Sequence, residues 1–403
     1  MKICLISNLY NPWIIGGAEI YVEYLAKELS KKHEVFIITS EPFNGLKSLM
    51  PKAEIQDNIK IYRFYPANVY HTYYAKNSPD LIKPIWHLID IWNPHSYLLI
   101  QRILNKEKPD VVHTHNLGGI SPSALYAAKN CRIPVVHTLH DYSFICPRAT
   151  LIHERSHNIC DYPATFCKLY RELKKKTTNS VDLTTSPSNF VLDIFENTGF
   201  FDSSHQNISI PLGIGNTIKS DRKQKDTLDL LYVGQIAKHK GIDTLIKAFK
   251  EMDVKNIKLH IVGTGIYGDE IRKMADDSRI TIHGFVSSEQ KEELFSIADI
   301  CVVPSVWYEN SPVVIYESFF HGVPVVGSRI GGIPELIREG YNGLLFEAGN
   351  PKELRHSLLY LVNHPDELKK MSEGALESAK KCTIQAHTSK LEDIYTSLIA
   401  AKK

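Results

Sequence analysis

The stretch Val303-Pro-Ser-Val-Trp-Tyr-Glu-Asn-Ser-Pro-Val-Val-Ile-Tyr-Glu-Ser-Phe-Phe-His-Gly322 joins the end of an apolar run to a segment of helix length. Ser311 is predicted to cap that helix, and Pro312 to occupy its first position, where proline is well tolerated. The backbone N–H groups of Val313 and Val314 then have no partner within the helix. A helix N-terminus of this kind binds anions, and a diphosphate is the natural occupant.

Two glutamates flank this predicted anion site, Glu309 just before the helix and Glu317 within it. From Ser311 to Glu317 the helix rises about 9 Å, at roughly 1.5 Å per residue. Because like charges repel, the two carboxylates are better placed to accept hydrogen bonds from hydroxyl groups on either side of the anion. That pattern fits a sugar, a diphosphate and a ribose in line. The alternative interpretation is an ordinary helix with two solvated glutamates.

The whole chain has 403 residues, enough for two or three domains. Hydrophobic residues make up 43% and charged residues 23%, which is typical of a globular protein. Lysine and arginine number 47 against 45 acidic residues, and this near balance gives no support for a nucleic-acid partner. No apolar run has the length of a membrane span or of a signal peptide's apolar region. With seven cysteines, an odd number, the sequence predicts a reduced, cytoplasmic protein.

Short apolar runs alternate with amphipathic segments of helix length in two successive series. The runs are 2–7, 34–39, 59–64, 110–113 and 134–138, then 228–233, 257–262, 279–283, 300–303 and 324–327. This alternation predicts an α/β fold of two doubly wound domains, each with a parallel sheet covered on both faces. The polar stretch 205–226 is predicted to contain the boundary. Open parallel sheets bind ligands at the carboxyl ends of their strands, so the following loops are where site residues are expected.

Further motifs accompany Glu309 and Glu317 in order along the chain. They are Gly-Gly-Ala-Glu at 16–19, Asp-Val-Val-His-Thr-His at 110–115, Lys240-Gly241, Ile-Val-Gly-Thr-Gly at 261–265, His-Gly-Phe at 283–285 and Gly-Val-Pro-Val-Val at 322–326. With the pair Glu309-x7-Glu317, this order resembles the family 4 retaining glycosyltransferases over most of the chain. The resemblance implies the GT-B fold: two facing Rossmann-like domains with parallel sheets and an interdomain cleft.

The resemblance also implies the activity, namely retaining transfer of a hexosyl unit from a UDP- or GDP-sugar to a glycan or lipid-linked glycan acceptor in cell-surface polysaccharide biosynthesis. No acidic metal motif stands out at a strand end, so no cofactor is expected to be required. The implied domains are an N-terminal acceptor-binding domain over 1–210 and a C-terminal nucleotide-sugar-binding domain over 211–385. A C-terminal helix over 386–403 is expected to pack on either domain, and in one of the two cases it crosses back to the N-terminal domain.

By resemblance, Glu309 contacts the donor sugar and Glu317 the nucleotide ribose. The donor-binding residues expected in the loops after the strands are Gly16, Gly17, Gln235, Lys238, Gly263, Gly265, Phe285, Val286, Ser311, Val313, Val314 and Glu317. Lys240 is expected to pair with the diphosphate as a point charge. The family usually has an arginine where this chain has Gln235. Either Lys238 substitutes for that charge, or the helix N-terminus and Lys240 suffice, or catalysis is weaker.

Three residues after the strands of the first series are candidates for the acceptor side. His115 follows the run 110–113, where the resemblance implies a histidine close to the donor sugar, and it is assigned a catalytic role together with Glu309 and Lys240. His140 and Asp141 follow the run 134–138 and are expected to position the acceptor hydroxyl. A structural histidine at a strand end is the alternative interpretation.

A rival interpretation starts from Gly263-Thr-Gly-Ile-Tyr-Gly268, a literal G-x-G-x-x-G after an apolar run. A dinucleotide-dependent oxidoreductase also needs an acid at the end of the next strand, and Thr281-Ile-His-Gly284 supplies none. The oxidoreductase is therefore disfavoured. A sugar-nucleotide epimerase or hydrolase on the same fold, and a non-catalytic nucleotide-sugar binding protein, remain open.

Two further features have a functional and a plain interpretation. Cysteine and histidine gather in one segment and could hold zinc, although none of the spacings is the short C-x2–4-C type. These residues are Cys146, His153, His157, Cys160 and Cys167. Basic residues gather over 168–176 and aromatic ones over 62–97. They predict peripheral contact with an anionic membrane at its inner face, or else a solvated helix and a core.

Overall fold

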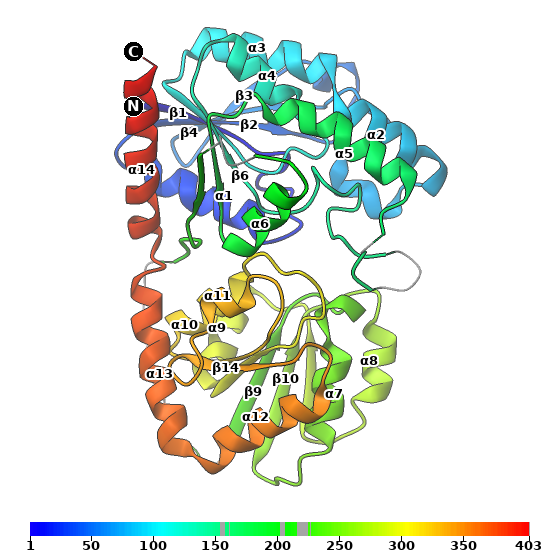
Figure 1. Cartoon of the computed structure of the whole chain (residues 1–403), viewed down its shortest axis with the longest axis vertical. Helices are drawn as coiled ribbons and strands as arrows, with labels where there is room; N and C mark the ends of the chain where they lie inside the picture. The colour runs from blue at the N-terminus through cyan, green and yellow to red at the C-terminus, as the bar shows by residue number, and fades with distance from the viewer. Residues whose placement is uncertain (154–157, 161, 202–205, 216–224, 226, 403) are drawn as a thin grey trace. The chain divides into compact units, whose positions relative to one another are not determined.

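The structure, a computed structural model, describes residues 1–153, 158–160, 162–201, 206–215, 225 and 227–402. The chain divides into two compact units (Figure 1). Unit 1 comprises Met1–Leu151, Asp161–Gly213 and Ile384–Lys403. Unit 2 comprises Ile152–Cys160 and Ile214–Thr383.

Unit 1 is built on an eight-stranded sheet of order β3-β4-β2-β1-β5-β6-β7-β8. Its strands are β1 (Lys2–Ile6), β2 (Glu34–Ser40), β3 (Lys52–Gln56), β4 (Ile59–Phe64), β5 (Val111–Thr114), β6 (Val135–Thr138), β7 (Leu183–Ser186) and β8 (Gln206–Ser209). All neighbouring strands are parallel except β3 and β4. The central strands are buried, which explains their continuous apolar sequences.

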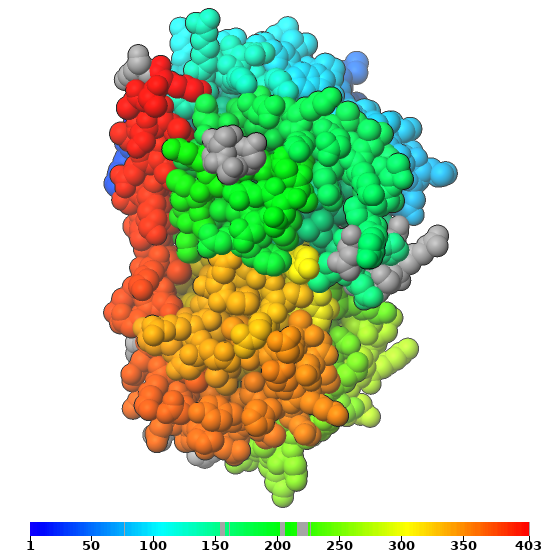
Figure 2. All heavy atoms as spheres, viewed as in Figure 1, coloured from blue at the N-terminus to red at the C-terminus, as the bar shows by residue number. Residues whose placement is uncertain are grey.

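The helices of unit 1 come from both ends of the chain. They are α1 (Gly17–Leu29), α2 (Lys83–Ile91), α3 (Pro94–Glu107), α4 (Ser123–Asn130), α5 (Thr165–Thr178), α6 (Asn189–Asn197) and α14 (Ile384–Ala401), with 3-10 turns η1 (Leu46–Leu49), η2 (Thr72–Asn77) and η3 (Asp80–Ile82). Helix α3 packs on α4, and α14 packs on α1 (Figure 1). In the space-filling view the red atoms of α14 lie at the surface of unit 1 (Figure 2). Unit 1 therefore contains both the N-terminal and the C-terminal segments of the chain.

Unit 2 is built on a six-stranded parallel sheet of order β11-β10-β9-β12-β13-β14. Its strands are β9 (Leu228–Val233), β10 (Ile257–Val262), β11 (Ile280–Gly284), β12 (Ile300–Val303), β13 (Val325–Ser328) and β14 (Gly343–Phe346). Its helical segments are η4 (Lys238–Lys240), α7 (Ile242–Lys250), α8 (Gly268–Met274), α9 (Ser288–Ile297), α10 (Val313–Phe320), α11 (Ile333–Leu336), α12 (Pro351–Asn363) and α13 (Pro365–Lys380). Buried side chains of β9, β10, α7 and α12 form its core.

The predicted α/β fold with two parallel-sheet units is confirmed, and ten strands lie where the apolar runs are. The prediction of wholly parallel sheets is wrong for β3, an edge strand with exposed charged residues that runs antiparallel to β4. Three other strands were missed: β7 because its sequence Leu-Thr-Thr-Ser is polar although buried, β8 because it lies in the polar stretch read as a boundary, and β14 because it begins with glycine, a residue depleted in strands.

Strand order fixes where each sheet has its ligand-binding edge. Connections from β1 lead outward in one direction and those from β5 in the other, and the same reversal occurs in unit 2 between β9 and β12. At such a switch point the loops after two adjacent strands part and leave a crevice at the carboxyl edge. The loops after β9 and β12 carry Lys240 and Glu309, and the loops after β1 and β5 carry Gly16 and His115.

Candidate functional site

Helix α10 of unit 2 begins at Val313, directly after the loop that follows β12. Its N-cap residue is Pro312, and no side chain caps the first turn. The prediction of Ser311 as the cap is therefore wrong by one residue, because the Ser311 hydroxyl instead hydrogen-bonds the Tyr316 hydroxyl at 2.5 Å. The uncapped first turn retains backbone N–H groups, including those of Val313 and Val314, that have no acceptor within the helix. This is the geometry of an anion site.

Glu309 is 6% exposed and lies just before this helix end. Its Oε1 accepts hydrogen bonds from Lys240 Nζ and from Ser305 Oγ, each at 2.7 Å. Burial acts to raise the pKa of Glu309, but the Lys240 charge and these hydrogen bonds outweigh it and hold the pKa below its usual value. The carboxylate is therefore ionised, and Lys240 is its counter-ion.

Glycines allow three loops to meet around Glu309. Gly332 N donates to the Glu309 carbonyl at 2.7 Å, and a Cβ on Gly331, whose φ is +62°, would lie 2.4 Å from that same oxygen. Gly241 has φ of +67°, and a Cβ there would lie 1.8 Å from the Pro304 carbonyl. Only glycine fits such contacts, so these positions bring the loops after β9, β12 and β13 together.

Glu317 lies within α10 and also has a lysine partner. Lys291 Nζ, from α9, donates to Glu317 Oε1 at 2.6 Å, and both side chains are about one-quarter exposed. Sequence reasoning missed Lys291, Ser305, Gly331 and Gly332. The Gly-Gly pair after a strand was a usable signal, whereas nothing local marks Lys291 among the other lysines.

The remaining donor-binding candidates line the same edge of the unit 2 sheet. A Cβ on Gly263 would lie 1.8 Å from the Gly234 carbonyl oxygen, and a Cβ on Gly265 would lie 2.1 Å from the Ile236 carbonyl oxygen. The glycine spacing thus serves close packing of the loops after β9 and β10. The side chain of Phe285 is 85% exposed, Val286 beside it is half-buried, and Gln235 and Lys238 are exposed.

In unit 1, Gly16 is the N-cap of α1 and Gly17 its first residue. The backbone N–H of Gly16 is bound to Glu19, whose Oε2 accepts it at 2.7 Å and accepts Ile15 N at 3.4 Å. Burial raises the pKa of Glu19, although these backbone hydrogen bonds oppose the shift. At the N-terminus of α1 a carboxylate therefore occupies the place that an anion would take.

The acceptor-side candidates lie at the carboxyl edge of the unit 1 sheet. His115 is fully buried, and its Nδ1 hydrogen-bonds His140 Nε2 at 3.1 Å. Burial lowers the pKa of His140 to about 3 and that of His115 well below its usual value, so both rings are neutral. Burial also raises the pKa of Asp141. The structure brings His115 and His140 into contact and places Asp141 next in the same loop.

Helix α14 contributes to this histidine cluster from the far end of the chain. Tyr21 OH hydrogen-bonds His387 Nε2 at 2.6 Å, and Tyr395 OH hydrogen-bonds His113 Nδ1 at 2.6 Å. His113 Nε2 continues the chain of hydrogen bonds to Thr138 Oγ1 at 2.6 Å. Sequence reasoning missed His387 and Tyr395, since 366 residues separate His387 from Tyr21 and 282 separate Tyr395 from His113.

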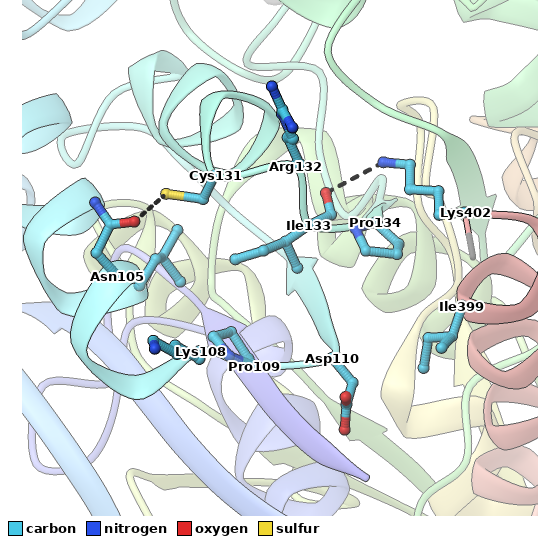
Figure 3. Close-up of a pocket in the computed structure, with 11 residues that line it drawn as sticks. Asn105, Lys108, Pro109, Asp110, Cys131, Arg132, Ile133, Pro134, Ile399 and Lys402 are labelled. Atoms are coloured by element: carbon cyan, nitrogen blue, oxygen red, sulfur yellow. Dashed lines mark hydrogen bonds between the residues drawn. The ribbon is translucent and has the colours of Figure 1, made fainter.

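Two surface cavities lie away from these edges. One in unit 1, of about 450 Å³, is lined by residues of α3 and α14, by Cys131, and by Asp110 and Pro134, which directly precede β5 and β6 (Figure 3). The other, of about 380 Å³, is lined by residues 250–255 and Arg279 in unit 2. Both are at the amino ends of strands, and neither contains a predicted site residue.

The predicted metal segment is only partly described, since His157 lies outside the described residues. Among those that are described, no group of three or more His, Cys, Asp or Glu side chains is placed to hold a metal ion. Over the same described part of the chain, no helix is long and apolar enough to span a bilayer. Of the basic stretch 168–176, Lys174 is buried, so its prediction as a surface charge is wrong.

Comparison with known proteins agrees with this architecture. A family model described as "Glycosyltransferase Family 4" matches residues 15–206, and one described as "Glycosyl transferases group 1" matches residues 214–378. An uncharacterized 42.6 kDa protein in the cps region of Klebsiella pneumoniae is 30% identical over 346 residues, which cover 84% of this chain and 88% of that protein.

Solved structures share the fold. Sucrose-phosphate synthase from Thermosynechococcus elongatus superposes with a TM-score of 0.77 at 18% identity, covering 99% of each chain. Anabaena HepE in complex with UDP superposes with a TM-score of 0.70 at 16% identity, covering 98% of this chain and 100% of that one. Two family matches that follow the two units, together with these folds, establish that the chain belongs to the family 4 glycosyltransferases of the GT-B fold.

Proposed function

We propose that this glycosyltransferase is retaining and moves a hexosyl unit from a UDP- or GDP-sugar to a glycan or lipid-linked glycan. One observation carries the proposal: an ionised, buried Glu309 with Lys240 as its counter-ion stands beside the uncapped N-terminus of α10, at the switch point of the unit 2 sheet. Such a site offers cationic and N–H groups to a diphosphate, and a carboxylate to sugar hydroxyls.

The proposed chemistry is electrostatic. The bond between the anomeric carbon and the donor's phosphate oxygen breaks while the acceptor oxygen bonds that carbon from the same face. The leaving phosphate oxygen takes the acceptor's proton. The N-terminus of α10 and Lys240 stabilise the charge that develops on the diphosphate, and Glu309 and Glu317 accept hydrogen bonds from the donor sugar and the ribose. These steps involve residues of this chain and the donor, with no required cofactor.

The chain lacks the arginine that the family usually has at the position of Gln235. We assign its charge to Lys238, which is exposed in the same loop and whose Nζ lies 5.5 Å from the Tyr267 ring. The Lys240 charge is already bound to Glu309, so a second cation is needed when a diphosphate with two or more negative charges binds. Gly263, Gly265, Phe285 and Val286 are assigned to the nucleoside.

Within this proposal residues 211–385 bind the donor, and residues 1–210 with the helix 386–403 bind the acceptor. His115, His140 and Asp141 then face the acceptor. Gly16 and Gly17 are assigned to the donor phosphate, which would have to displace the Glu19 carboxylate from Gly16 N. Neutral histidines suit this role, because they hydrogen-bond hydroxyl groups without attracting a second anion. The relative in a cps region supports an acceptor of cell-surface polysaccharide biosynthesis.

We also propose that unit 1 contacts an anionic membrane from the cytoplasmic side. Exposed apolar side chains follow helical spacing around α2, at Leu81, Ile85 and Leu88, and exposed basic Lys168 lies on neighbouring α5. Apolar insertion and basic charge together give reversible binding to anionic lipid. Sedimentation with phosphatidylglycerol vesicles at low salt, lost at high salt, is the expected result, and no binding at low salt refutes it.

The donor is tested first, by a thermal-shift panel of UDP-, GDP- and ADP-sugars, since ligand binding to the folded state raises its melting temperature. Product analysis by NMR then gives the anomeric configuration, and an inverted product refutes retention. Incubation with donor alone separates the alternatives: free sugar would indicate a hydrolase, an isomerised donor an epimerase, and unchanged donor with no transfer to any acceptor a binding protein.

A further inference from the structure

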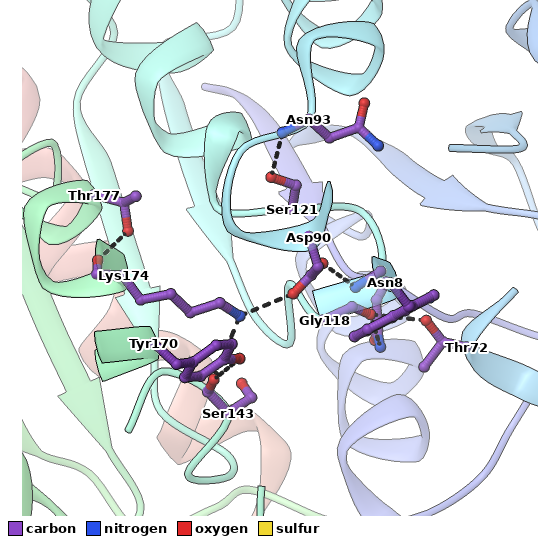
Figure 4. Close-up of polar contacts among 12 residues, drawn as sticks. Asn8, Thr72, Asp90, Asn93, Gly118, Ser121, Ser143, Tyr170, Lys174 and Thr177 are labelled. Atoms are coloured by element: carbon purple, nitrogen blue, oxygen red, sulfur yellow. Dashed lines mark hydrogen bonds and ion pairs between the residues drawn. The ribbon is translucent and has the colours of Figure 1, made fainter. Parts of the chain in front are cut away.

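A buried ion pair in unit 1 links two helices that carry none of the predicted catalytic residues. Lys174 of α5 and Asp90 of α2 are each 1% exposed, and Lys174 Nζ lies 2.8 Å from Asp90 Oδ2 (Figure 4). The ammonium also lies 4.8 Å from the centre of the Tyr170 ring. Burial acts to lower the pKa of Lys174, but Asp90 and Tyr170 outweigh it and the pKa is raised, so Lys174 carries its positive charge beside the Asp90 carboxyl group.

Both members of this pair also bind loops at the carboxyl edge of the sheet. Asp90 Oδ1 accepts the backbone N–H of Gly119 at 2.6 Å, four residues after His115. Lys174 Nζ donates to the Ser143 carbonyl at 3.4 Å, two residues after Asp141. The loops after β5 and β6 are thus joined through two charged side chains from outside them.

Neighbouring contacts hold each loop in the same position. Tyr170 OH donates to the Ser143 carbonyl at 2.7 Å, and Thr72 Oγ1 donates to the Gly118 carbonyl at 3.0 Å (Figure 4). Gly119 has φ of +101°, and a Cβ there would lie 2.0 Å from Thr72 Oγ1, so the approach of Gly119 to Asp90 requires glycine.

A buried ion pair is weak evidence for stability, because desolvation offsets its attraction and an apolar pair of similar volume is often at least as stable. We propose that Asp90 and Lys174 are positioning residues that set the loop carrying His115 against the loop carrying His140 and Asp141. This inference rests on the proposed acceptor role of those three residues. It assigns a function in acceptor use to two helices that carry none of those three residues.

The test is the double variant Asp90→Leu with Lys174→Met, which removes both charges together and leaves no unpaired buried ion. Hydrogen exchange is expected to quicken in residues 116–121 and 139–145 while β1 and α10 stay as in the wild type. With UDP-glucose or GDP-mannose as donor and p-nitrophenyl hexosides as acceptors, kcat/KM for the acceptor should fall about 100-fold, as for a catalytic group displaced by an ångström. The donor KM should stay within about twofold of the wild type, because the donor site is on unit 2.

Tyr170→Phe is a milder variant that keeps the ring over Lys174 but removes one bond to Ser143. It should quicken exchange in residues 139–145 only. Glu107→Gln is the matched control, since Glu107 pairs with Lys2 at 2.7 Å at the start of β1. It should lower stability and leave acceptor kinetics unchanged.

Unchanged exchange in both loops, or an unchanged acceptor kcat/KM in the folded double variant, overturns the inference. A wild type that transfers to no acceptor refutes the proposed function instead, and the exchange measurements still decide whether the ion pair positions the loops. If the double variant does not fold, unchanged exchange of residues 139–145 in Tyr170→Phe overturns the inference.

Discussion

The carboxyl edges of the two sheets differ in charge: ion pairs occur at the edge in unit 2, and neutral side chains occur at the edge in unit 1. In unit 2 each glutamate of the site has a lysine partner, Glu309 with Lys240 and Glu317 with Lys291. In unit 1 the edge is a cluster of buried histidines, all neutral because burial lowers their pKa. In unit 2, a charged ligand can replace one member of such an ion pair as the partner of the other member. A neutral cluster is suited to hydroxyl groups, because a neutral imidazole has one hydrogen-bond donor and one acceptor.

The largest effect is expected from a variant that removes a charge from the unit 2 site. Glu309→Gln keeps the shape of the side chain but removes the charge that Lys240 balances, so transfer is expected to fall about 100- to 1000-fold in kcat, as when one preorganised electrostatic partner is lost. Steady-state kinetics with the best donor measure it. Glu339→Gln, a surface carboxylate 3.3 Å from Arg329, is the control and should behave as the wild type. Retention of more than a tenth of the activity in Glu309→Gln would exclude the assigned role.

A smaller effect is expected from the counter-ion. Lys240→Met removes a charged hydrogen bond worth about 2 kcal/mol, so donor kcat/KM should fall about 30-fold. Lys247, which pairs with Asp243 on the exposed face of α7 at 3.2 Å, provides the comparison. If Lys240→Met and Lys247→Met have equal donor kinetics, Lys240 is outside the donor site.

Acid is expected to weaken unit 1 through its neutral histidines. Burial lowers the pKa of His387 to about 4. Between pH 6.5 and 4, His387 is therefore protonated in the unfolded chain and neutral in the folded chain. Stability therefore falls as pH falls through that window, by about 2 kcal/mol at pH 5 for this one group. Urea unfolding at pH 7 and pH 5 measures the difference.

His387→Gln retains a hydrogen-bonding side chain for Tyr21 but cannot titrate, so its loss of stability between pH 7 and pH 5 should be smaller than that of the wild type by this amount. His356→Gln, at an exposed position of α12, should not change the pH dependence. If the wild type and His387→Gln lose the same stability between pH 7 and pH 5, His387 is not a buried, neutral group in the folded protein.

The smallest expected effect concerns the second ion pair of unit 2. Lys291 and Glu317 are each about one-quarter exposed, and pairs of this kind contribute about 0.5–1 kcal/mol. Lys291→Met should therefore raise the donor KM by about two- to fivefold with little change in kcat. A loss in kcat as large as that of Glu309→Gln would mean that Lys291 acts in the reaction itself.

The two edges also differ in how well the sequence predicts them. In unit 2 the partners Glu309, Pro312, Val313 and Glu317 lie within one loop and helix, so spacing alone indicates the anion site, and the apolar runs predict the strands beneath it. Sequence could not fix the cap, because a hydroxyl contact between Ser311 and Tyr316 decides it.

In unit 1 the deciding contacts join distant parts of the chain. His113 meets Tyr395 and Asp90 meets Lys174 across 282 and 84 residues, and no local pattern marks either pair. Lys174 shows the consequence. Because it lies among other lysines, the sequence predicts that its side chain is exposed, whereas the side chain is buried against Asp90 of a different helix.

In the proposed function, the N-terminus of α10 and its flanking glutamates bind a nucleoside diphosphate. A crystal structure of the protein with UDP tests it most directly. We expect phosphate oxygens within about 3.2 Å of the N–H groups of Val313 or Val314, with ribose hydroxyls at Glu317. A pyrophosphate held instead by the loop Gly263–Gly268, with α10 unoccupied, would contradict it.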